Sequence, residues 1–410
     1  MTKNVLVIGL NPKIVNIIEN MADDIILFIL EEKELYENNY LSFHSSICQE
    51  VRIGSYQQSL DCVDTAVRWN EEIRFDAVIP GREYSVIAVN EIAKRLGLRR
   101  LGDVAADSLT NKYKLRTVAS KLGILQPRFA KIEQFEDLVQ FYQSKPLMLK
   151  PVNRQASTGV IKIESKDDLA LAWVETTNAT EGNLVVTQRP LIWEYMSEDY
   201  VEGFEISVES FVKDGQVLFH NITKKLTTVG KYSVEIGHII PGDIHEEIRE
   251  EVIDAKQKLI QGLAVQNGLL HSEWIINEQG SFLIECAGRA PGGLIPELFE
   301  LAYDLNLFKA YINVLLGLEV QFPSQFCHVA AAIYFTPPSG KLISVKGFDV
   351  LGNIPSIKRI ESGFELGQLI EPLTSNWARK GYVVLQSTNY EQLEKTITEI
   401  NETVKFEVSS

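Results

Sequence analysis

The sequence predicts a protein of the mixed α/β and α+β class, with an open parallel α/β domain at its N-terminus. Three observations favour this class. Strand and helix patterns alternate over the first hundred residues, shorter and less regular elements follow between residues 129 and 210, and a small α+β segment begins after residue 323. With 410 residues, 45% of them hydrophobic and 23% charged, the chain is long enough for two to four domains.

The N-terminal domain, residues 1–110, is predicted to be a parallel sheet with helices between its strands. The expected elements are strand "NVLVIGL", a helix over residues 14–21, strand "IILFIL", strand "FDAVIP" and a helix through "YSVIAVNEIAKRLGL". A glycine ends the first strand, as in nucleotide-binding folds. The sequence contains neither GxGxxG nor GxxxxGK[ST], so the dinucleotide-binding and P-loop families are excluded.

Glu83 lies in "PGREYS", just after a predicted strand and before a helix. Open α/β sheets bind their ligands at this edge, so Glu83 is a candidate substrate-binding residue. The alternative is a solvated carboxylate in a loop or in the first turn of the helix. The position alone does not separate the two.

The second domain is expected over residues 111–322 and the third over residues 323–410. A helix over residues 112–122, closed by Gly123, leads into a lid subdomain at about residues 128–197. The third domain is predicted to begin with two strands around the Pro-Pro-Ser-Gly turn of "HVAAAIYFTPPSGKLISVKG". It ends with strand "GYVVLQS", a helix over residues 390–401 and strand "VKFEVS".

The charge and the cysteine content exclude several classes of function. The formal net charge is −15 and the pI is near 5.0, so we expect no nucleic-acid surface, because phosphate backbones require a basic one. The four cysteines form no CxxC pair, which argues against a zinc cluster or a disulfide framework. The longest apolar runs are too short to span a bilayer and no signal-peptide layout is present, so we expect a cytoplasmic protein without a membrane segment.

Two glutamates are predicted to face each other in a β-hairpin. The stretch "LLHSEWIINEQGSFLIECAGR" contains two strand patterns that meet at "EQG", a favoured three-residue loop that would pair Asn277 with Ser281. Counting outward places Glu273 opposite Glu285 on a face shared with Leu283, with the two glutamate Cβ atoms roughly 4.5–5.5 Å apart. Such a pair either shares a proton or binds a divalent cation, for which oxygen ligands favour Mg²⁺ or Mn²⁺. An exposed hairpin with solvated glutamates is the alternative.

Two other stretches carry charged side chains next to glycines. In "PLMLKPVNRQASTGVIKI", Lys150 ends an apolar strand before a small-residue loop, where an ammonium and the backbone N–H groups of residues 157–159 suit phosphate binding. The alternative for this lysine is a side chain that extends to solvent. In "EDYVEGFEISVES", Glu198, Glu202 and Glu205 surround a glycine, which by itself indicates a charged turn that enters a strand.

Taken together and in this order, these stretches resemble the ATP-grasp superfamily of carboxylate–amine ligases. The resemblance spans nearly the whole chain and rests on "NKYKL", "LKPVNRQASTGV", the hinge "EDYVEGFE" and "IECAGRAPGG". Within the superfamily the sequence is similar to the L-amino-acid ligases, the bacilysin-type dipeptide synthetases of antibiotic biosynthesis, through "PGREYSV", "NITKKLTT", "EIGHIIP" and "YFTPPSGKLISVKG". It also resembles a ligase of the rhizocticin pathway that activates arginine. The resemblance implies the ATP-grasp fold.

The resemblance further implies that ATP is bound by the central domain. The phosphates would be contacted by two lysines and by the small-residue loop, and the adenosine by the hinge. Glu198 would take the adenine amino group, backbone groups the ring edge, and Glu205 the ribose. The full set implied is Lys112, Lys150, Ser157, Gly159, Glu198, Asp199, Val201 and Glu205.

By the same resemblance, Glu273 and Glu285 would hold Mg²⁺ between the β- and γ-phosphates. This agrees with the independent argument from the hairpin. Many relatives have Asn two residues after the second glutamate, where it helps to hold a second ion, but this chain has Ala287. Either water and phosphate oxygens fill that place or only one ion is held tightly. His271, predicted to face Ala287, is a candidate substitute ligand.

The resemblance implies that Arg289 meets both the transferred phosphoryl group and the reacting carboxylate. Gly292 and Gly293 would let backbone amides approach the tetrahedral intermediate. A structural Arg–Glu pair is the alternative for Arg289. Lys224, or the lysine after it, is a candidate neighbour of the acceptor substrate, and Glu83 a candidate for a substrate ammonium or cationic side chain.

The reaction implied is phosphorylation of one amino acid by ATP, followed by attack of the amine of a second on the acyl phosphate. We therefore expect two free amino acids as substrates, ATP and Mg²⁺ as cofactors and, from the resemblance, a homodimer. Two rival hypotheses stay open. One is an ATP-grasp ligase or carboxylase that uses another acid, and the other is an ATP-binding module without turnover.

Overall fold

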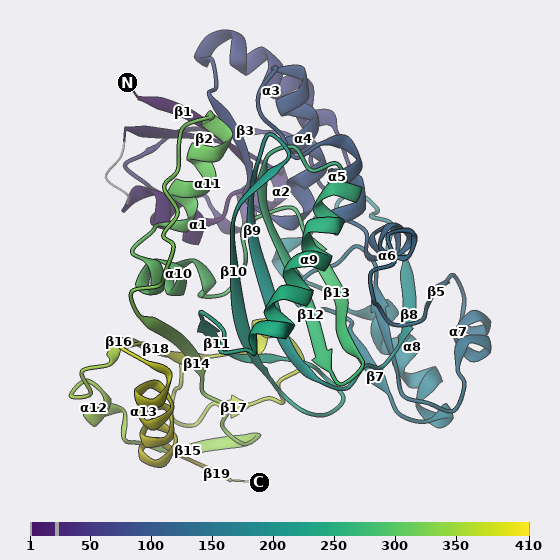
Figure 1. Ribbon diagram of the computed structural model, residues 1–410, viewed down its shortest axis with the longest axis vertical. Coiled ribbons are helices and arrows are strands. Elements are labelled where there is room, and N and C mark those ends of the chain that lie inside the picture. The colour runs from purple at the N-terminus through teal and green to yellow at the C-terminus, as the bar shows by residue number, and fades with distance from the viewer. Residues whose placement is uncertain (1, 21–23, 410) are drawn as a thin grey trace.

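The computed structural model describes residues 2–20 and 24–409. In that part of the chain, three sheets with their helices surround a longer sheet that crosses the centre of the molecule (Figure 1). The helix predicted over residues 14–21 is found as α1 (Pro12–Glu19), and residue 21 lies outside the described residues.

Four parallel strands form the N-terminal sheet, in the order β3-β2-β1-β4, which confirms the predicted open parallel sheet. Glu83 begins a short 3₁₀ turn directly after the last of these strands, at their carboxyl edge. Helices cover the sheet, and α5 leads on to the next part of the chain. The elements are β1 (Lys3–Ile8), β2 (Ile25–Glu31), α2 (Lys33–Asn39), β3 (Cys48–Ile53), α3 (Asp61–Ile73), β4 (Ala77–Pro80), α4 (Val86–Arg95) and α5 (Asp103–Leu109).

A second, antiparallel sheet with two helices occupies the region predicted as the lid, at the right of Figure 1. Its strands run in the order β5-β8-β6-β7, and a helix, α6, precedes it. The elements are α6 (Lys112–Lys121), β5 (Phe129–Ile132), α7 (Phe135–Phe141), β6 (Leu147–Pro151), β7 (Ile161–Ile163), α8 (Leu169–Asn178) and β8 (Tyr195–Asp199).

The central sheet has eight strands in the order β13-β12-β9-β10-β11-β14-β18-β16. Strands on both sides of residue 322 belong to it, so the domain border predicted there falls inside one continuous sheet and stays a prediction. Its first part consists of β9 (Phe204–Lys213), β10 (Gln216–Thr227), β11 (Glu235–Ile240), α9 (Glu246–Gly262), β12 (Gly268–Asn277), β13 (Gly280–Ala287), α10 (Ile295–Tyr303) and α11 (Leu307–Leu316).

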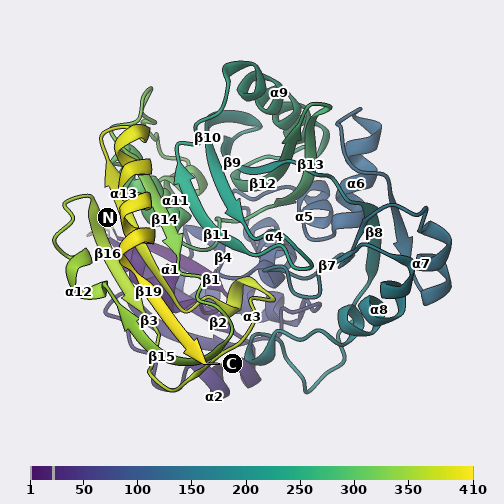
Figure 2. The ribbon, with the colours of Figure 1, turned by 90° about the horizontal axis from the view of Figure 1, so that it is seen from below.

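The C-terminal segment adds strands to the central sheet and builds a small sheet of its own, in the order β17-β15-β19 (Figure 2). The two strands predicted around the Pro-Pro-Ser-Gly turn are both present, but they belong to different sheets. The elements are β14 (Val329–Tyr334), β15 (Gly340–Lys346), α12 (Phe348–Leu351), β16 (Ile357–Ser362), β17 (Leu369–Ile370), β18 (Gly381–Ser387), α13 (Tyr390–Thr403) and β19 (Lys405–Ser409).

The two faces of the central sheet differ because side chains alternate along each strand. On β9, Ile206, Val208 and Val212 pack into a core with α5, α6 and α9. Phe211 packs on the opposite face with α10 and α11. Glu205 and the other odd-numbered residues of β9 lie on that second face, toward the N-terminal domain. The polar residues Glu205, Ser207 and Glu209 therefore share one face of the sheet.

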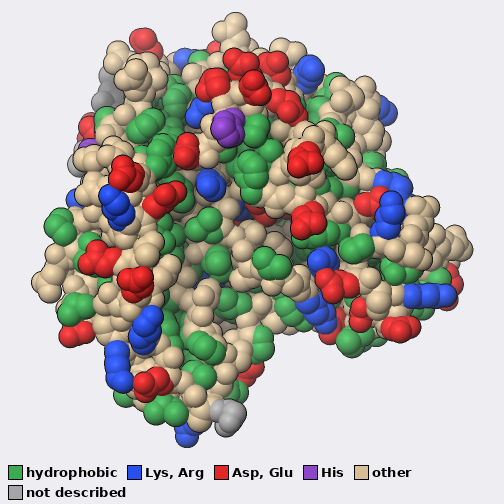
Figure 3. Space-filling view, turned by 60° about the horizontal axis from the view of Figure 1, so that its bottom comes forward, with side chains coloured by type: hydrophobic (Ala, Val, Ile, Leu, Met, Phe, Trp, Pro, Cys, Tyr) green, Lys and Arg blue, Asp and Glu red, His purple; other side chains and the backbone are tan. Residues whose placement is uncertain are grey.

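The surface is hollowed between the lid at the right and the C-terminal segment at the lower left of Figure 3. A groove there is lined by Thr158, Gly159 and Tyr232 on one side and by Thr374 and Ser375 on the other. Within residues 2–20 and 24–409, no helix is long and apolar enough to cross a membrane.

Candidate active site

The hairpin of β12 and β13 brings Glu273 opposite Glu285, as predicted. The details of the prediction were wrong in two respects. Asn277 pairs with Gly280 and not with Ser281, and a bulge between Glu273 and the next residue pair moves Leu283 to the other face, where it is buried in the core with α9. The shorter turn and the inserted residue offset each other, so the glutamate pairing survives.

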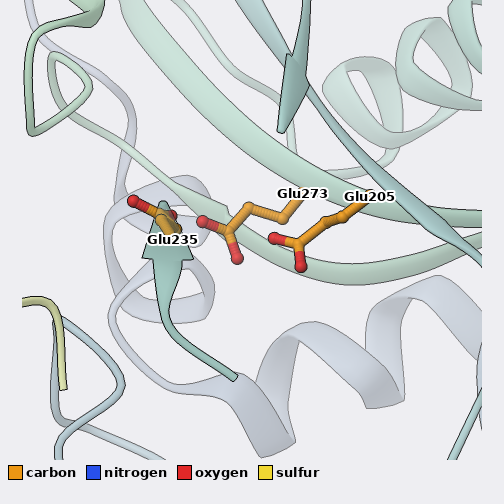
Figure 4. A group of neighbouring side chains, drawn as sticks. All are labelled: Glu205, Glu235 and Glu273. Atoms are coloured by element: carbon orange, nitrogen blue, oxygen red, sulfur yellow. The ribbon is translucent and has the colours of Figure 1, made fainter. Parts of the chain in front are cut away.

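Three carboxylates, Glu205, Glu235 and Glu273, point toward one another from β9, β11 and β12 (Figure 4). One oxygen atom from each lies within 4.8 Å of the others. The ammonium of Lys225, from β10, is bonded to all three, at 2.7 Å from Glu235 and 2.9 Å from Glu273. Burial lowers the pKa of Lys225, but the three carboxylates outweigh it and raise the pKa well above its usual value. The three carboxylates thus already hold one cation, the ammonium of Lys225.

A buried polar chain leads from this cluster into the sheet. Nδ1 of His271 lies 2.9 Å from Glu209, and its Nε2 lies 3.4 Å from Glu273. Glu209 accepts further hydrogen bonds from Ser207 and Thr223, so its carboxylate is fully paired. His271 also pairs with Ala287 in the sheet register, as predicted. The imidazole is therefore fixed in orientation, with one nitrogen turned to Glu273.

Lys112 lies at the first turn of α6, where its N–H donates to the carbonyl of Val152. Its ammonium pairs with Glu285 at 2.9 Å and donates to the carbonyl of Arg154 at 2.7 Å. A recess is lined by these residues together with Glu83. Lys112 and Glu285 were predicted to bind phosphate and metal, and the fold brings them into direct contact.

Lys150 and Glu198 form a buried ion pair, and the guanidinium of Arg116 holds the other oxygen of Glu198 at 2.7 Å. Burial lowers the pKa of Lys150, while for Glu198 the two cations outweigh burial and lower the pKa of the carboxyl. Lys150 does not extend to solvent. Any contact of Glu198 with an adenine amino group would come in addition to these two bonds.

The hinge begins at Glu198 in the chain, and the small-residue loop follows Lys150. The N–H of Asp199 donates to the carbonyl of Arg128, so this N–H is already paired within the protein. In the loop, Ser157 and Gly159 both have positive φ, at 59° and 72°. A Cβ at Gly159 would lie 3.0 Å from Ala179 and 3.2 Å from the carbonyl of Thr176, because the loop rests against the end of α8.

Arg289 donates from Nε to Glu83 at 2.6 Å and from Nη1 to the carbonyl of Ala290 at 2.8 Å. Burial lowers the pKa of Arg289, but Glu83 and Glu285 outweigh it and raise the pKa above its usual value. The alternative of an Arg–Glu pair is realised in this structure. Glu83 also lines the recess that contains Lys112 and Glu285, so the pair borders the candidate site.

The Pro-Gly-Gly bend lies against β11 and β14. Gly293 has φ of 63°, and a Cβ there would lie 3.5 Å from Cε1 of His238 and 3.7 Å from the hydroxyl of Tyr334. A Cβ at Gly292 would meet open space. Nε2 of His238 lies 3.3 Å from Glu235, close enough for an ion pair, but neither ring nitrogen forms a hydrogen bond with the described residues.

Lys224 and Lys225 lie on opposite faces of β10 because side chains alternate along a strand. Lys225 is the lysine inside the carboxylate cluster, whereas Lys224 pairs with Ile239 and Ile206 in the sheet register. Either lysine was predicted to lie near the acceptor substrate, and the structure brings Lys225 to the carboxylate cluster.

The carboxylates of this site fit a magnesium ion. Glu273 faces Glu285 across the hairpin, and Glu205 and Glu235 lie nearby, so the donors are all oxygen atoms, which a hard divalent cation prefers. A lysine ammonium already balances the charge of Glu273 and another that of Glu285. A divalent ion would therefore replace or move these ammonium contacts.

Comparison with known proteins agrees with this geometry. Residues 143–297 match the model of the ATP-grasp domain. The chain carries an ATP-grasp domain. Residues 333–409 match the L-amino acid ligase C-terminal domain 2, so the resemblance stated from the motifs is confirmed.

Three similar proteins extend this comparison. The alanine–anticapsin ligase of Bacillus subtilis (strain 168) is 26% identical over 282 residues, which cover 64% of this chain and 59% of that protein. An L-arginine-specific L-amino acid ligase of Bacillus subtilis is 22% identical over 58% of this chain and 57% of its own. The crystal structure of an L-amino acid ligase from Bacillus licheniformis superposes with a TM-score of 0.81 at 18% identity, over 100% of this chain and 99% of that one. The chain thus spans less than two thirds of the curated relatives' length but has the same fold as the solved ligase.

Several residues of the candidate site were not predicted from the sequence. Arg116 stands four residues after Lys112, a spacing that puts both on one helix face, so the signal was present. Glu209 continues the alternation of Glu205 and Ser207 and was visible in the same way. Glu235 and His238 lie in "EIGHIIP", which indicated only the family resemblance, and no local signal predicted that both would reach the site.

Proposed function

We propose that the protein is an ATP-dependent L-amino-acid ligase that joins two free amino acids into a dipeptide through an aminoacyl phosphate. One observation carries this proposal. Lys112, Glu285 and Glu83 line one recess, and Glu83 holds Arg289. A group for phosphate, a ligand for a divalent cation and a guanidinium for a carboxylate therefore lie together, as acyl-phosphate chemistry requires.

In this proposal the nucleotide lies between the lid and the central sheet. Lys112 and Lys150 bind its phosphates and exchange their present carboxylate partners for phosphate oxygens. The loop with Ser157 and Gly159 covers the phosphates and excludes water, which would otherwise hydrolyse the acyl phosphate. The hinge binds adenosine through Glu198, the backbones of Asp199 and Val201, and Glu205.

The first step forms a bond between a carboxylate oxygen of the first amino acid and the γ-phosphorus, and ADP leaves. Arg289 orients that carboxylate and offsets the charge that develops on the transferred group. Mg²⁺, held by Glu273 and Glu285, would neutralise phosphate charge. Phosphorylation is needed because a free carboxylate repels nucleophiles and oxide is not a leaving group.

In the second step the amine of the other amino acid attacks the acyl carbon, phosphate leaves and the amine loses a proton. The N–H groups of Gly292 and Gly293 are suited to the oxyanion of the tetrahedral intermediate. Glu235 and His238 lie beside that bend, so we assign them to the incoming ammonium and its proton. Glu83 shares its carboxylate between Arg289 and a substrate ammonium or cationic side chain.

The test is release of phosphate from ATP and Mg²⁺ across a matrix of amino-acid pairs, with product masses recorded. We expect release that depends on both amino acids and a product whose mass is that of a dipeptide. Release driven by another acid, such as bicarbonate, would instead favour a different ATP-grasp ligase or carboxylase. Binding of ATP without any turnover would favour a non-catalytic module.

We also propose that the chain forms a homodimer, on the family resemblance alone. Sedimentation equilibrium measures the mass directly. A mass of one chain at micromolar concentration contradicts this assembly and leaves the proposed reaction untouched.

A further inference from the structure

We propose that Asn376 and Arg379, in the loop before β18, are positioning residues for the active site. They hold the backbone of Glu235 at an irregular point of β11 and so fix where its carboxylate lies. The inference rests on the proposed function for its kinetic readout, and it has a structural readout that does not.

Glu235 and His238 are three residues apart, so in a regular strand they would lie on opposite faces. The register of β10 and β11 shows why they do not. Lys225 pairs with His238, but Thr227 pairs with Glu235, which leaves one extra residue in β11. This bulge turns Glu235 to the face of Lys225 and His238. Glu235 reaches the carboxylate cluster only because the bulge is kept.

On the side toward β14, the backbone of Glu235 has no strand partner among the described residues. The pairing of β11 with β14 extends from Ile240 only to Gly237. The loop before β18 takes the place of the missing partner. The N–H of Glu235 donates to Oδ1 of Asn376 at 3.0 Å, and Nη1 of Arg379 donates to the carbonyl of Glu235 at 3.0 Å. Both backbone groups are thereby satisfied, which a bulge in a buried strand requires.

Further contacts hold the loop in place. Nε of Arg379 donates to the carbonyl of Asn376 at 2.8 Å, and its guanidinium lies 4.0 Å above the ring of Tyr334. Nη1 also lies 3.6 Å from Oε2 of Glu235. Arg379 therefore contacts the backbone of Glu235, the carboxylate of Glu235 and the ring of Tyr334, which lies beside Gly293.

It follows that the C-terminal segment has a part in the reaction. Its loop sets the position of Glu235 relative to Lys225 and Glu273, although neither Asn376 nor Arg379 is assigned to touch a substrate. Loss of either should loosen the bulge and weaken binding of the amino acid that Glu235 contacts. Nucleotide binding, which depends on the lid, should be unaffected.

The test compares Arg379→Met with Lys380→Met, a basic residue next to it whose exposed side chain bonds only to Gln368 among the described residues. For Arg379→Met we expect a rise of roughly 10-fold or more in KM for one amino acid, with KM for ATP changed less than about 2-fold, because a charge-assisted hydrogen bond is lost. Arg379→Lys should recover part of the loss. Lys380→Met should match the wild type.

Two further measurements separate positioning from general destabilisation. In the Glu235→Gln background, Arg379→Met should add little, because its effect passes through that carboxylate. Hydrogen exchange of the peptide that contains Glu235 should accelerate in Asn376→Ala, while peptides of the lid stay as in the wild type. This second readout needs no turnover, so it stands even if the wild type fails to ligate amino acids.

The inference is overturned if exchange at Glu235 is unchanged in Asn376→Ala. It is equally overturned if Arg379→Met and Lys380→Met raise the same KM to the same extent, or if the effects of Arg379→Met and Glu235→Gln simply add.

Discussion

Arg289 donates a hydrogen bond from Nε to Glu83 at 2.6 Å, which joins two residues that are 206 positions apart in the chain. The pair connects the carboxyl edge of the N-terminal sheet with the loop that follows β13. Separate roles were predicted for the two residues, a substrate cation for Glu83 and the phosphoryl group for Arg289. Their contact means that each sets the position of the other.

This contact predicts that Arg289 and Glu83 act as a unit. Arg289→Ala should lower kcat by roughly 100-fold or more, because it removes a donor aimed at developing charge. Glu83→Gln should chiefly alter amino-acid preference. A double-mutant cycle on kcat/KM should give a coupling on the order of 1–3 kcal/mol. Arg95→Ala, which breaks a surface ion pair with Glu91 on α4, is the control and should leave kcat and KM unchanged. Near-normal ligation by Arg289→Ala would remove this residue from the site.

A second prediction concerns the metal. Glu273→Gln and Glu285→Gln should each weaken the binding of Mn²⁺ in the presence of ADP by roughly tenfold or more and abolish ligation, with the circular dichroism spectrum unchanged. Electron paramagnetic resonance of Mn²⁺ measures the binding and also counts the ions. Glu278→Gln, at the exposed tip of the same hairpin, should bind Mn²⁺ like the wild type. Equal affinity in all three variants would place the metal elsewhere.

A third prediction is about stability. Arg116 and Glu198 are 1% and 2% exposed, so Arg116→Met leaves a buried carboxylate with one cation in place of two. We expect the free energy of unfolding to fall by about 3 kcal/mol, near the lower end for a broken buried pair because Lys150 remains. Arg128→Met breaks a pair with Asp199 that is 40% and 36% exposed, and should cost less than about 1 kcal/mol. Urea titrations of the two variants give the comparison, and equal losses would contradict it.

A fourth prediction concerns pH. The pKa of His220 is lowered to about 4 in the folded protein. Burial of the imidazole is the main cause, and the positive charge of Lys256 is the second. In the unfolded chain this histidine binds a proton near its ordinary pKa of about 6.5. The free energy of unfolding is therefore highest above that pH and falls as the pH drops from 6.5 to 4. His220→Asn, which keeps an acceptor for Ser210, should remove on the order of 2 kcal/mol of this decline. Identical pH profiles for the two proteins would rule out this contribution.

Much of the fold and of the site could be predicted from local patterns. The parallel N-terminal sheet follows from the alternation of strands and helices, and the Glu273–Glu285 pairing follows from hairpin counting. The predicted pairing is correct although the hairpin turn is one residue shorter than predicted. The bulge that compensates for it has no mark in the sequence, which is why Leu283 was assigned to the wrong face.

The carboxylate cluster could not be predicted in full for the same reason. Glu205 and Glu273 lie where β9 and β12 pair in regular register, so the alternation of side chains puts both on one face once the two strands are neighbours. Glu235 reaches that face only through a bulge that Asn376 and Arg379 support from another part of the chain. No sequence pattern near Glu235 indicates that Asn376 and Arg379 contact it.

The sequence by itself determined the order of the motifs, the chemistry of the side chains and the faces of the regular strands, because these depend on neighbours within a few residues. Only the tertiary structure decided that Lys225 and not Lys224 enters the cluster, that Glu83 binds Arg289, and that the C-terminal loop closes the bulge at Glu235. A single inserted residue reverses the face of a strand, and a contact across 206 residues depends on every element between its ends.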